Sequence, residues 1–215
     1  MESGNSAVTG LIVEASEIVK NFNRRAVLRN ISFRLSMGES LAVTGKNGSG
    51  KSTLVKIVCG LLSPTKGTVS YHVEGKPWSL EELRHTLGLV SPYLQLYEEF
   101  SAEENLELIS TIRNNVHPSP ERSEELLRAF SLWERRRDAV RTYSSGMKQR
   151  LKYVVALMHD PMLLVLDEPT ANLDDEGIEA VKSVLAGQRN RGLLIVATND
   201  EREAAWCSKR VHVGL

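Results

Sequence analysis

The pattern of hydrophobic and polar residues changes its period several times along the 215-residue chain. Residues 31–35 and 67–75 alternate between apolar and polar side chains, which predicts strands with one buried face. Residues 41–44, 163–166 and 193–197 are almost continuously apolar, as is typical of strands buried on both faces. The pattern therefore predicts sheet in the first third of the chain and again in its last quarter.

Apolar residues at helical spacing fill the stretches between these predicted strands. Ser101 with Glu104 forms the sequence signature of a capping box, and Ser119 followed by Pro120 marks the start of another helix. A further helix is predicted at residues 178–185.

The order of these elements predicts an α/β fold with an N-terminal antiparallel β subdomain and an inserted α-helical lobe. We assign residues 1–90 and 160–215 to the α/β core and residues 91–159 to the lobe. We expect residues 1–215 to form a single domain, although this length also accommodates two.

Composition and charge argue against several classes of protein. Lys and Arg number 27, as do Asp and Glu, so we expect no nucleic acid partner on electrostatic grounds. No apolar run approaches the ~20 residues of a membrane-spanning helix, and the first ten residues lack a secretory pattern. We therefore expect a cytoplasmic protein. The two cysteines, Cys59 and Cys207, lack metal-ligand spacing and receive no role.

The most specific motif is a glycine-rich stretch directly after residues 41–44. It matches the phosphate-binding loop G-x-x-x-x-G-K-[ST] at every required position. The residues concerned are Gly45, Lys46, Asn47, Gly48, Ser49, Gly50, Lys51, Ser52 and Thr53. Glycines let backbone amides approach phosphate oxygens, while Lys51 can reach the β- and γ-phosphates and Ser52 supplies a hydroxyl for Mg²⁺. The strand, loop and helix in succession predict a P-loop NTPase core, with Lys51 among its catalytic residues.

Two acidic residues follow the apolar run at residues 163–166. A buried strand would carry Asp167 to the mouth where the phosphates lie, and its carboxylate could hold Mg²⁺ there. Glu168 would project toward the γ-phosphate and orient or deprotonate the attacking water, which makes it the predicted catalytic carboxylate. The alternative, a strand that merely ends at the surface, is disfavoured by the intact phosphate-binding loop.

A second anion site is predicted at Ser144, Ser145 and Gly146. These small residues precede apolar positions at helical spacing, so they would expose backbone amides at the start of an amphipathic helix. The economical interpretation is that this helix start meets the γ-phosphate of a nucleotide bound by another copy or another subunit. An ordinary serine N-cap is the alternative.

With these motifs in this order, the chain resembles the nucleotide-binding subunit of an ATP-binding cassette (ABC) transporter, of the single-cassette bacterial type, over nearly its whole length. Residues 143–147 resemble the family signature usually written LSGGQ, and residues 172–174 resemble the loop that links two active sites. The resemblance implies that two such subunits, identical or different, enclose two ATP molecules, with Ser144, Gly146 and Asp174 at their contact.

The resemblance also implies a place for the adenine base and a second partner. Phe22 resembles the aromatic residue that stacks on adenine, and a plain core or strand-edge phenylalanine is the alternative. The second partner is an integral membrane transport subunit, which places the chain on the inner face of the cell membrane. Tyr93, Tyr97 and Phe100 lie in the segment that docks this subunit in the family, although they could equally pack within the domain.

Two positions depart from the family pattern, and both lie where hydrolysis is controlled. The glutamine that senses Mg²⁺ and water falls at Ser91 or Pro92, so Gln95 is the only nearby candidate to replace it, although a glutamine in a polar loop is more often solvent-facing. Asn199 stands where the family has a histidine on the γ-phosphate. Asparagine can donate a hydrogen bond but cannot become cationic, so we expect slow basal ATP hydrolysis.

These features predict an ATP-binding and ATP-hydrolysing subunit that drives transport through a separate membrane subunit. One alternative is a soluble ABC ATPase that acts on nucleic acid or ribosomes. Another is an ATP-gated regulatory clamp in which binding matters more than turnover. A short basic run at residues 135–137 could contact phosphates, but such runs are usually solvated faces.

Overall fold

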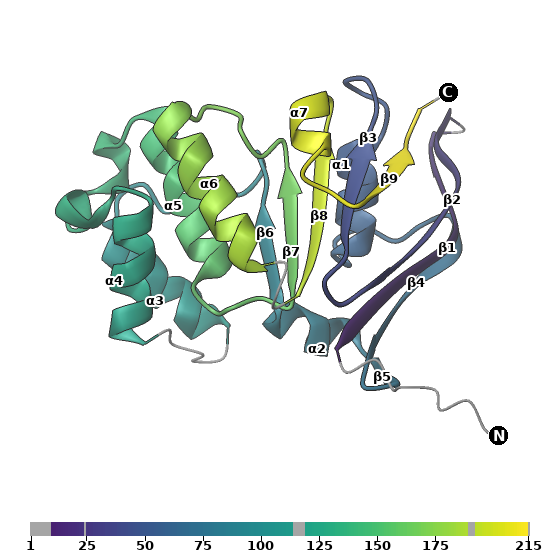
Figure 1. Ribbon diagram of the computed structural model, residues 1–215, viewed down its shortest axis with the longest axis horizontal. Coiled ribbons are helices and arrows are strands. Elements are labelled where there is room, and N and C mark those ends of the chain that lie inside the picture. The colour runs from purple at the N-terminus through teal and green to yellow at the C-terminus, as the bar shows by residue number, and fades with distance from the viewer. Residues whose placement is uncertain (1–9, 24, 114–118, 189–191, 215) are drawn as a thin grey trace.

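The computed structural model describes residues 10–23, 25–113, 119–188 and 192–214. In this part of the chain the strands form a four-stranded sheet with the order β2-β1-β4-β5 and a five-stranded sheet with the order β6-β7-β8-β3-β9. Figure 1 shows the larger sheet at the centre, the smaller sheet toward one end and helices α3 to α6 toward the other. The predicted α/β fold, with its β subdomain and helical lobe, is confirmed.

The smaller sheet is antiparallel between every pair of neighbouring strands. Its strands are β1 (Leu11–Phe22), β2 (Arg25–Ser36), β4 (Lys66–Val73) and β5 (Lys76–Trp78). The hydrophobic pattern does not predict strand β1, because the pairing of β1 with β2 shifts register between Ala15 and Ile18. Such a bulge moves the side-chain alternation by one residue, so the period of two is broken in the sequence.

The larger sheet is parallel between every pair of neighbouring strands. Its strands are β3 (Ser40–Thr44), β6 (Leu87–Val90), β7 (Leu163–Asp167), β8 (Leu193–Thr198) and β9 (Lys209–His212). Strand β9 at the edge is mostly exposed and carries polar residues, so no apolar run announces it in the sequence.

Strand β7 shows why its sequence is apolar without interruption. Leu163 and Val165 pack into the hydrophobic cluster shared with the antiparallel sheet and α1. Leu164 and Leu166 pack into a second cluster, shared with the helical lobe. Because neighbouring residues of a strand point to opposite faces, a sheet covered on both sides needs apolar residues at every position.

The helices after Gly50, Ser101, Ser119 and Ser144 begin where the sequence predicts them, whereas the helix predicted at residues 178–185 begins earlier, at Asp175, and no pattern predicts the helix Glu201–Ala204. Their bounds are α1 Lys51–Val58, α2 Leu80–His85, α3 Ala102–Ile112, α4 Pro120–Ala129, α5 Ser145–Leu157, α6 Asp175–Gln188 and α7 Glu201–Ala204, with short 3₁₀ turns at Trp133–Arg135 and Val140–Thr142. The capping box that starts α3 is present, since Ser101 and Glu104 hydrogen-bond each other's backbone amides. Ser119 caps α4, with Pro120 at its first position.

Helices α3, α4 and α5 all lie within the residues 91–159 that we assign to the lobe. Their buried side chains form one cluster with the facing side chains of β7 and β8, so the lobe rests directly on the parallel sheet. Across the described residues, no helix combines the length and the apolar character needed to cross a membrane.

Candidate functional site

The carboxyl ends of β3, β8 and β7 lie next to one another at a single edge of the parallel sheet, because β8 pairs with both of the other strands. The phosphate-binding loop leaves β3 at this edge and leads into α1. Asp167 ends β7, and Asn199 follows β8. Parallel sheets bind ligands in the crevice outside these strand ends, so the predicted site residues from three separate segments share one location.

The start of α1 is built to present free backbone amides. Its N-cap is Gly50, which has no side chain to hydrogen-bond the first turn and which adopts a left-handed φ of 109°. A Cβ atom at Gly45 would lie 2.1 Å from the carbonyl oxygen of Val213, so the loop passes too close to the chain after β9 for any side chain there. Unoccupied amides at a helix start form a ready anion site.

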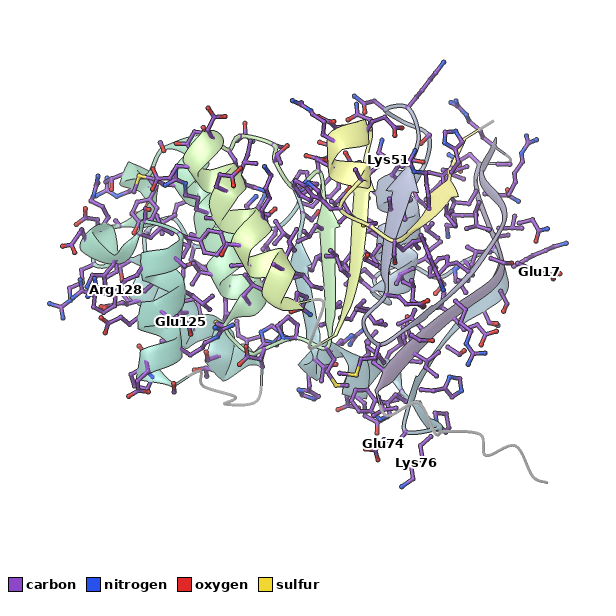
Figure 2. All side chains as sticks on the ribbon, viewed as in Figure 1. Glu17, Lys51, Glu74, Lys76, Glu125 and Arg128 are labelled. Carbon is purple, nitrogen blue, oxygen red and sulfur yellow. The ribbon has the colours of Figure 1, made fainter. Side chains whose placement is uncertain are left out.

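Lys51 lies inside the curve of this loop. Its side chain is 5% exposed, and Nζ donates hydrogen bonds to the carbonyl oxygens of Gly45 at 3.0 Å and Lys46 at 3.2 Å. Figure 2 shows Lys51 at the start of α1 within the fold, whereas Glu17 and Lys76 extend into solvent at the periphery. The loop thus positions an ammonium group next to the amides that would receive phosphate oxygens.

Asp167 has the surroundings expected of a metal ligand. Its side chain is 1% exposed, and its Oδ1 atom finds no hydrogen-bond partner among the residues that the structure describes. Burial raises the pKa of the Asp167 carboxyl, while a hydrogen bond from Ser52 and the charge of Lys51 oppose the increase. A buried acceptor without a partner, beside a hydroxyl, fits a divalent cation with oxygen ligands.

No group of three or more His, Cys, Asp or Glu residues with metal-binding geometry occurs in the described part of the chain. Mg²⁺ is usually held by one or two protein oxygens together with waters and substrate phosphates. The pair of Ser52 and Asp167 therefore fits Mg²⁺ that arrives with a nucleotide.

Glu168 turns the chain away from the buried strand. Its backbone N–H still donates to the carbonyl oxygen of Ala197 on β8 at 2.9 Å, but its φ of 54° is left-handed and its side chain is exposed. Non-glycine residues in this conformation cost energy and are common at functional sites. One residue after Asp167, the structure therefore presents an exposed carboxylate beyond the carboxyl end of β7.

Asn199 lies directly on the phosphate-binding loop. Its side chain is exposed, and Nδ2 donates a hydrogen bond to Oδ1 of Asn47 at 3.1 Å. The two residues are 152 positions apart in the sequence. An amide donor thus occupies the position where the family has an imidazole.

Phe22 lines a cleft of about 520 Å³ beside the phosphate-binding loop, together with Asn47 and Gly48. Its ring is 45% exposed, and the Nζ atom of Lys20 lies 5.1 Å from the ring centroid. An accessible aromatic face at this place, and not a packed core residue, suits a stacked base.

The signature residues lie elsewhere. Ser144 caps α5, because its Oγ accepts a hydrogen bond from the Met147 amide at 3.2 Å, and it remains exposed. A Cβ atom at Gly146 would lie 3.1 Å from the carbonyl oxygen of Asn172, so the signature and the linking loop lie side by side. Among the described residues that line the two clefts at the phosphate-binding loop, none comes from residues 144–146.

Asp174 is bonded within its own chain. Its Oδ1 accepts a hydrogen bond from the Gly177 amide at 2.9 Å at the start of α6, and it forms an ion pair with Arg150 of α5. The hydrogen bond from Arg150 is the main reason why the pKa of the Asp174 carboxyl is lowered. The linking loop is therefore fastened to the signature helix.

Gln95, the candidate to replace the family's sensing glutamine, is not among the described residues that line the two clefts at the phosphate-binding loop. Ser91 ends up buried after β6, where its Oγ accepts a hydrogen bond from the Tyr93 amide at 3.3 Å, while Pro92 is exposed. Gln95 lines a groove between the core and the lobe together with Tyr97. In the basic run at residues 135–137, Arg136 and Arg137 both form ion pairs with Glu103.

One residue of this region escapes sequence reasoning altogether. Glu203 on α7 is 5% exposed and accepts hydrogen bonds from Thr170, in the loop after β7, and from Thr198, the last residue of β8. An acidic residue in a short polar helix looks solvent-exposed in a sequence, so only the fold reveals its position.

Comparisons with known proteins identify the family. The sequence profile of the ABC transporter family matches residues 28–171, more than half of the chain. The lantibiotic transport ATP-binding protein SrtF of Streptococcus pyogenes is 32% identical over 87% of this chain and 80% of its own length. The linearmycin resistance ATP-binding protein LnrL of Bacillus subtilis is 32% identical over 89% of this chain, which spans 62% of LnrL.

Solved structures show the same fold. A structure described as the ATP-binding subunit of an ABC transporter superposes with a TM-score of 0.82 at 29% identity, covering 94% of this chain and 86% of that one. The dimeric bacterial cassette MJ0796 superposes with a TM-score of 0.81 at 23% identity, with 94% of each chain covered. The chain belongs to the ABC transporter family, as one of its ATP-binding and ATP-hydrolysing subunits.

Proposed function

We propose that this chain hydrolyses ATP between two cassettes and so drives transport through a separate membrane subunit. The proposal is based on one observation: the two predicted anion sites of the chain, the phosphate-binding loop and residues 144–146, lie apart. The phosphate-binding loop, Asp167 and Asn199 share one edge of the sheet, while residues 144–146 line neither cleft there. A helix start that faces away from its own nucleotide can complete the site of a second cassette, and MJ0796 is described as dimeric.

In the proposed mechanism the chain mainly binds, orients and moves one proton. Lys51 and the amides of the loop bind the β- and γ-phosphates, and Glu168 accepts the proton of the attacking water. Mg²⁺, held by Ser52 and Asp167, supplies neutralisation of phosphate charge when bound. Ser144 and Gly146 of the second cassette close the site around the γ-phosphate.

The hydrolysis rate depends on Asn199, which donates one neutral hydrogen bond where an imidazolium would add a charge. We expect Asn199→His to raise the rate of the isolated chain about tenfold, within the range of a single electrostatic contact to a transition state. Phosphate release should be measured for the wild type, Asn199→His and Asn199→Gln. Asn199→Gln retains an uncharged amide and should not accelerate hydrolysis. Fast turnover by the wild type, or no gain from histidine, contradicts this role.

The membrane partner is proposed from a groove of about 630 Å³ between the core and the lobe, lined in part by Leu61, Tyr97, Ile109 and Ile112. Leu61 is 59% exposed, Tyr97 48% and Ile112 62%, so the groove offers apolar surface that the described residues leave uncovered. An amphipathic helix of a membrane subunit fits such a groove. This docking would place the chain on the cytoplasmic face of the membrane, and a relative named for Nod factor export supports export as the direction.

The groove can be tested by affinity purification from solubilised membranes, using tagged Glu168→Gln chains loaded with ATP. We expect Ile112→Glu to reduce recovery of an integral membrane protein by at least about tenfold, because docking would bury its charge. Thr111→Glu, exposed on the same helix turn and outside the lining of the groove, is the matched control. Equal recovery with both variants rejects the groove, and nucleic acid in place of a membrane protein favours the soluble class of ABC ATPases.

A further inference from the structure

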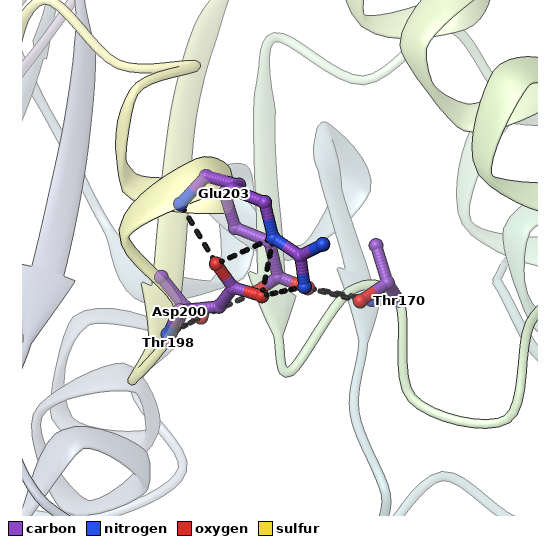
Figure 3. A network of polar contacts seen from close by, with 5 residues as sticks. Thr170, Thr198, Asp200 and Glu203 are labelled. Atoms are coloured by element: carbon purple, nitrogen blue, oxygen red, sulfur yellow. Dashed lines mark hydrogen bonds and ion pairs between the residues drawn. The ribbon is translucent and has the colours of Figure 1, made fainter.

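Glu203 is a buried carboxylate placed between two loops of the active site. Figure 3 shows it between Thr170 on one side and Thr198 on the other. Its Oε1 atom accepts hydrogen bonds from the backbone N–H of Thr170 at 3.2 Å and from the Thr170 hydroxyl, and its Oε2 atom accepts from the Thr198 hydroxyl. The neighbouring Arg202 is paired with Asp200 instead.

These two partners adjoin catalytic groups from different strands. Thr170 follows Glu168 by two residues in the loop after β7, and Thr198 ends β8 immediately before Asn199. The Thr198 hydroxyl also accepts a hydrogen bond from the Asp200 amide at 2.9 Å, so the bonds continue beyond Asn199. On the other side, the Tyr153 hydroxyl donates to the carbonyl oxygen of Pro169 at 2.6 Å. The loops around Glu168 and Asn199 are therefore joined through one side chain.

The chemistry of the carboxylate explains why an acid occupies this position. An ionised carboxylate has two acceptor oxygens and no donor, so it can serve all three donors at once. A glutamine has one acceptor oxygen and an NH₂ group, and at least one of the three donors would lose its bond. All three donors are uncharged groups, so these contacts are hydrogen bonds and not ion pairs. Because a buried polar group is costly without such partners, the three bonds are what stabilises the acid here.

We propose that Glu203 is a positioning residue for ATP hydrolysis, which holds the loop of Glu168 and the loop of Asn199 in a fixed relation. It lines neither cleft at the phosphate-binding loop, and it acts through Thr170 and Thr198. A displacement of about 1 Å between reacting groups can lower a rate about a hundredfold. The hydrogen bonds of Glu203 to Thr170 and Thr198 therefore control the rate of hydrolysis and leave the ATP affinity unchanged.

The test compares Glu203→Gln, Thr170→Val and Thr170→Ser in the full chain. Glu179→Gln is the control, because it makes the same chemical change on a side chain that is 72% exposed on α6. Four quantities should be measured: the single-turnover rate with labelled ATP, the ATP affinity, the binding stoichiometry, and hydrogen exchange of residues 168–174 and 198–200.

We expect Glu203→Gln and Thr170→Val to lower the rate about ten- to a hundredfold, with the ATP affinity changed less than about twofold and full binding stoichiometry. Thr170→Ser retains the hydroxyl and should restore the rate. Thr170→Val should also speed exchange at residues 198–200, on the other loop, which a local packing defect would not do. If Glu203→Gln does not fold, the Thr170 pair decides the question.

Two results overturn the proposal. An unchanged rate of hydrolysis and unchanged hydrogen exchange in Thr170→Val would show that the hydrogen bonds between Glu203 and Thr170 have no effect on catalysis. A loss of ATP binding stoichiometry that matches the loss of rate would show that Glu203 only stabilises the fold. Exchange needs no turnover, so slow hydrolysis by the wild type does not prevent a decision.

Discussion

We expect Glu168→Gln to lower the rate of ATP hydrolysis by at least about a hundredfold and to leave ATP binding intact. The glutamine retains the size and the exposed position of the side chain at the end of β7, but it cannot accept a proton from water. Loss of a general base typically costs 10²–10⁴ in rate. Because ATP persists, two cassettes stay closed around it, so the variant elutes as a dimer with ATP and as a monomer without it.

This prediction is checked by single-turnover phosphate release together with size-exclusion chromatography. Glu179→Gln on the surface of α6 controls for the chemical change and retains the wild-type rate. A rate within about tenfold of the wild type would falsify the assignment of Glu168 as the catalytic carboxylate. If Glu168→Gln loses hydrolysis as expected but forms no dimer with ATP, the two-cassette mechanism is contradicted instead.

Lys51→Ala has the second largest effect, and it acts on binding. We expect the ATP dissociation constant to rise about 10- to 150-fold, since a hydrogen bond to a charged group contributes about 1.5–3 kcal/mol. The truncation also removes the donor of the carbonyl oxygens of Gly45 and Lys46, so the loop loses its internal support in the nucleotide-free chain.

Titration with a fluorescent ATP analogue measures this effect. Lys51→Arg separates charge from shape, because a planar guanidinium cannot replace a compact ammonium inside the loop, and it should also bind weakly. Lys182→Ala removes an exposed lysine of α6 and should bind ATP normally. Wild-type affinity in Lys51→Ala would mean that the backbone amides alone hold the phosphates.

The parts of this protein that the sequence predicts well depend on neighbours in the chain. The capping box of Ser101 and Glu104 forms within one turn, and the glycines between residues 45 and 50 meet conformational demands of their own loop. Strand β7 is equally legible, because a strand buried on both faces must be apolar throughout. The P-loop NTPase core, the helix starts and the Asp167 and Glu168 pair follow from such local rules.

Other features depend on which strands become neighbours. The insertion of β8 between β7 and β3 brings Asn199 onto Asn47, which lies 152 positions away. No periodicity carries information about that pairing. The bulge in β1 and the polar residues of the edge strand β9 prevent the hydrophobic pattern from predicting these two strands. Gln95 lies in the groove and not at the phosphate site, a placement decided by the packing of the lobe.

The amino-acid sequence by itself determined the family and the phosphate-binding loop, and it predicts the chemical groups for hydrolysis, because these reside in short contiguous motifs whose backbone conformation is locally specified. Only the tertiary structure decided how those groups are held in relation to one another. Glu203 has no motif, and it joins Thr170 to Thr198 only because parallel pairing of β7 and β8 ends both strands at the same edge. Long-range contacts of this kind follow from strand order and burial, which local sequence does not encode.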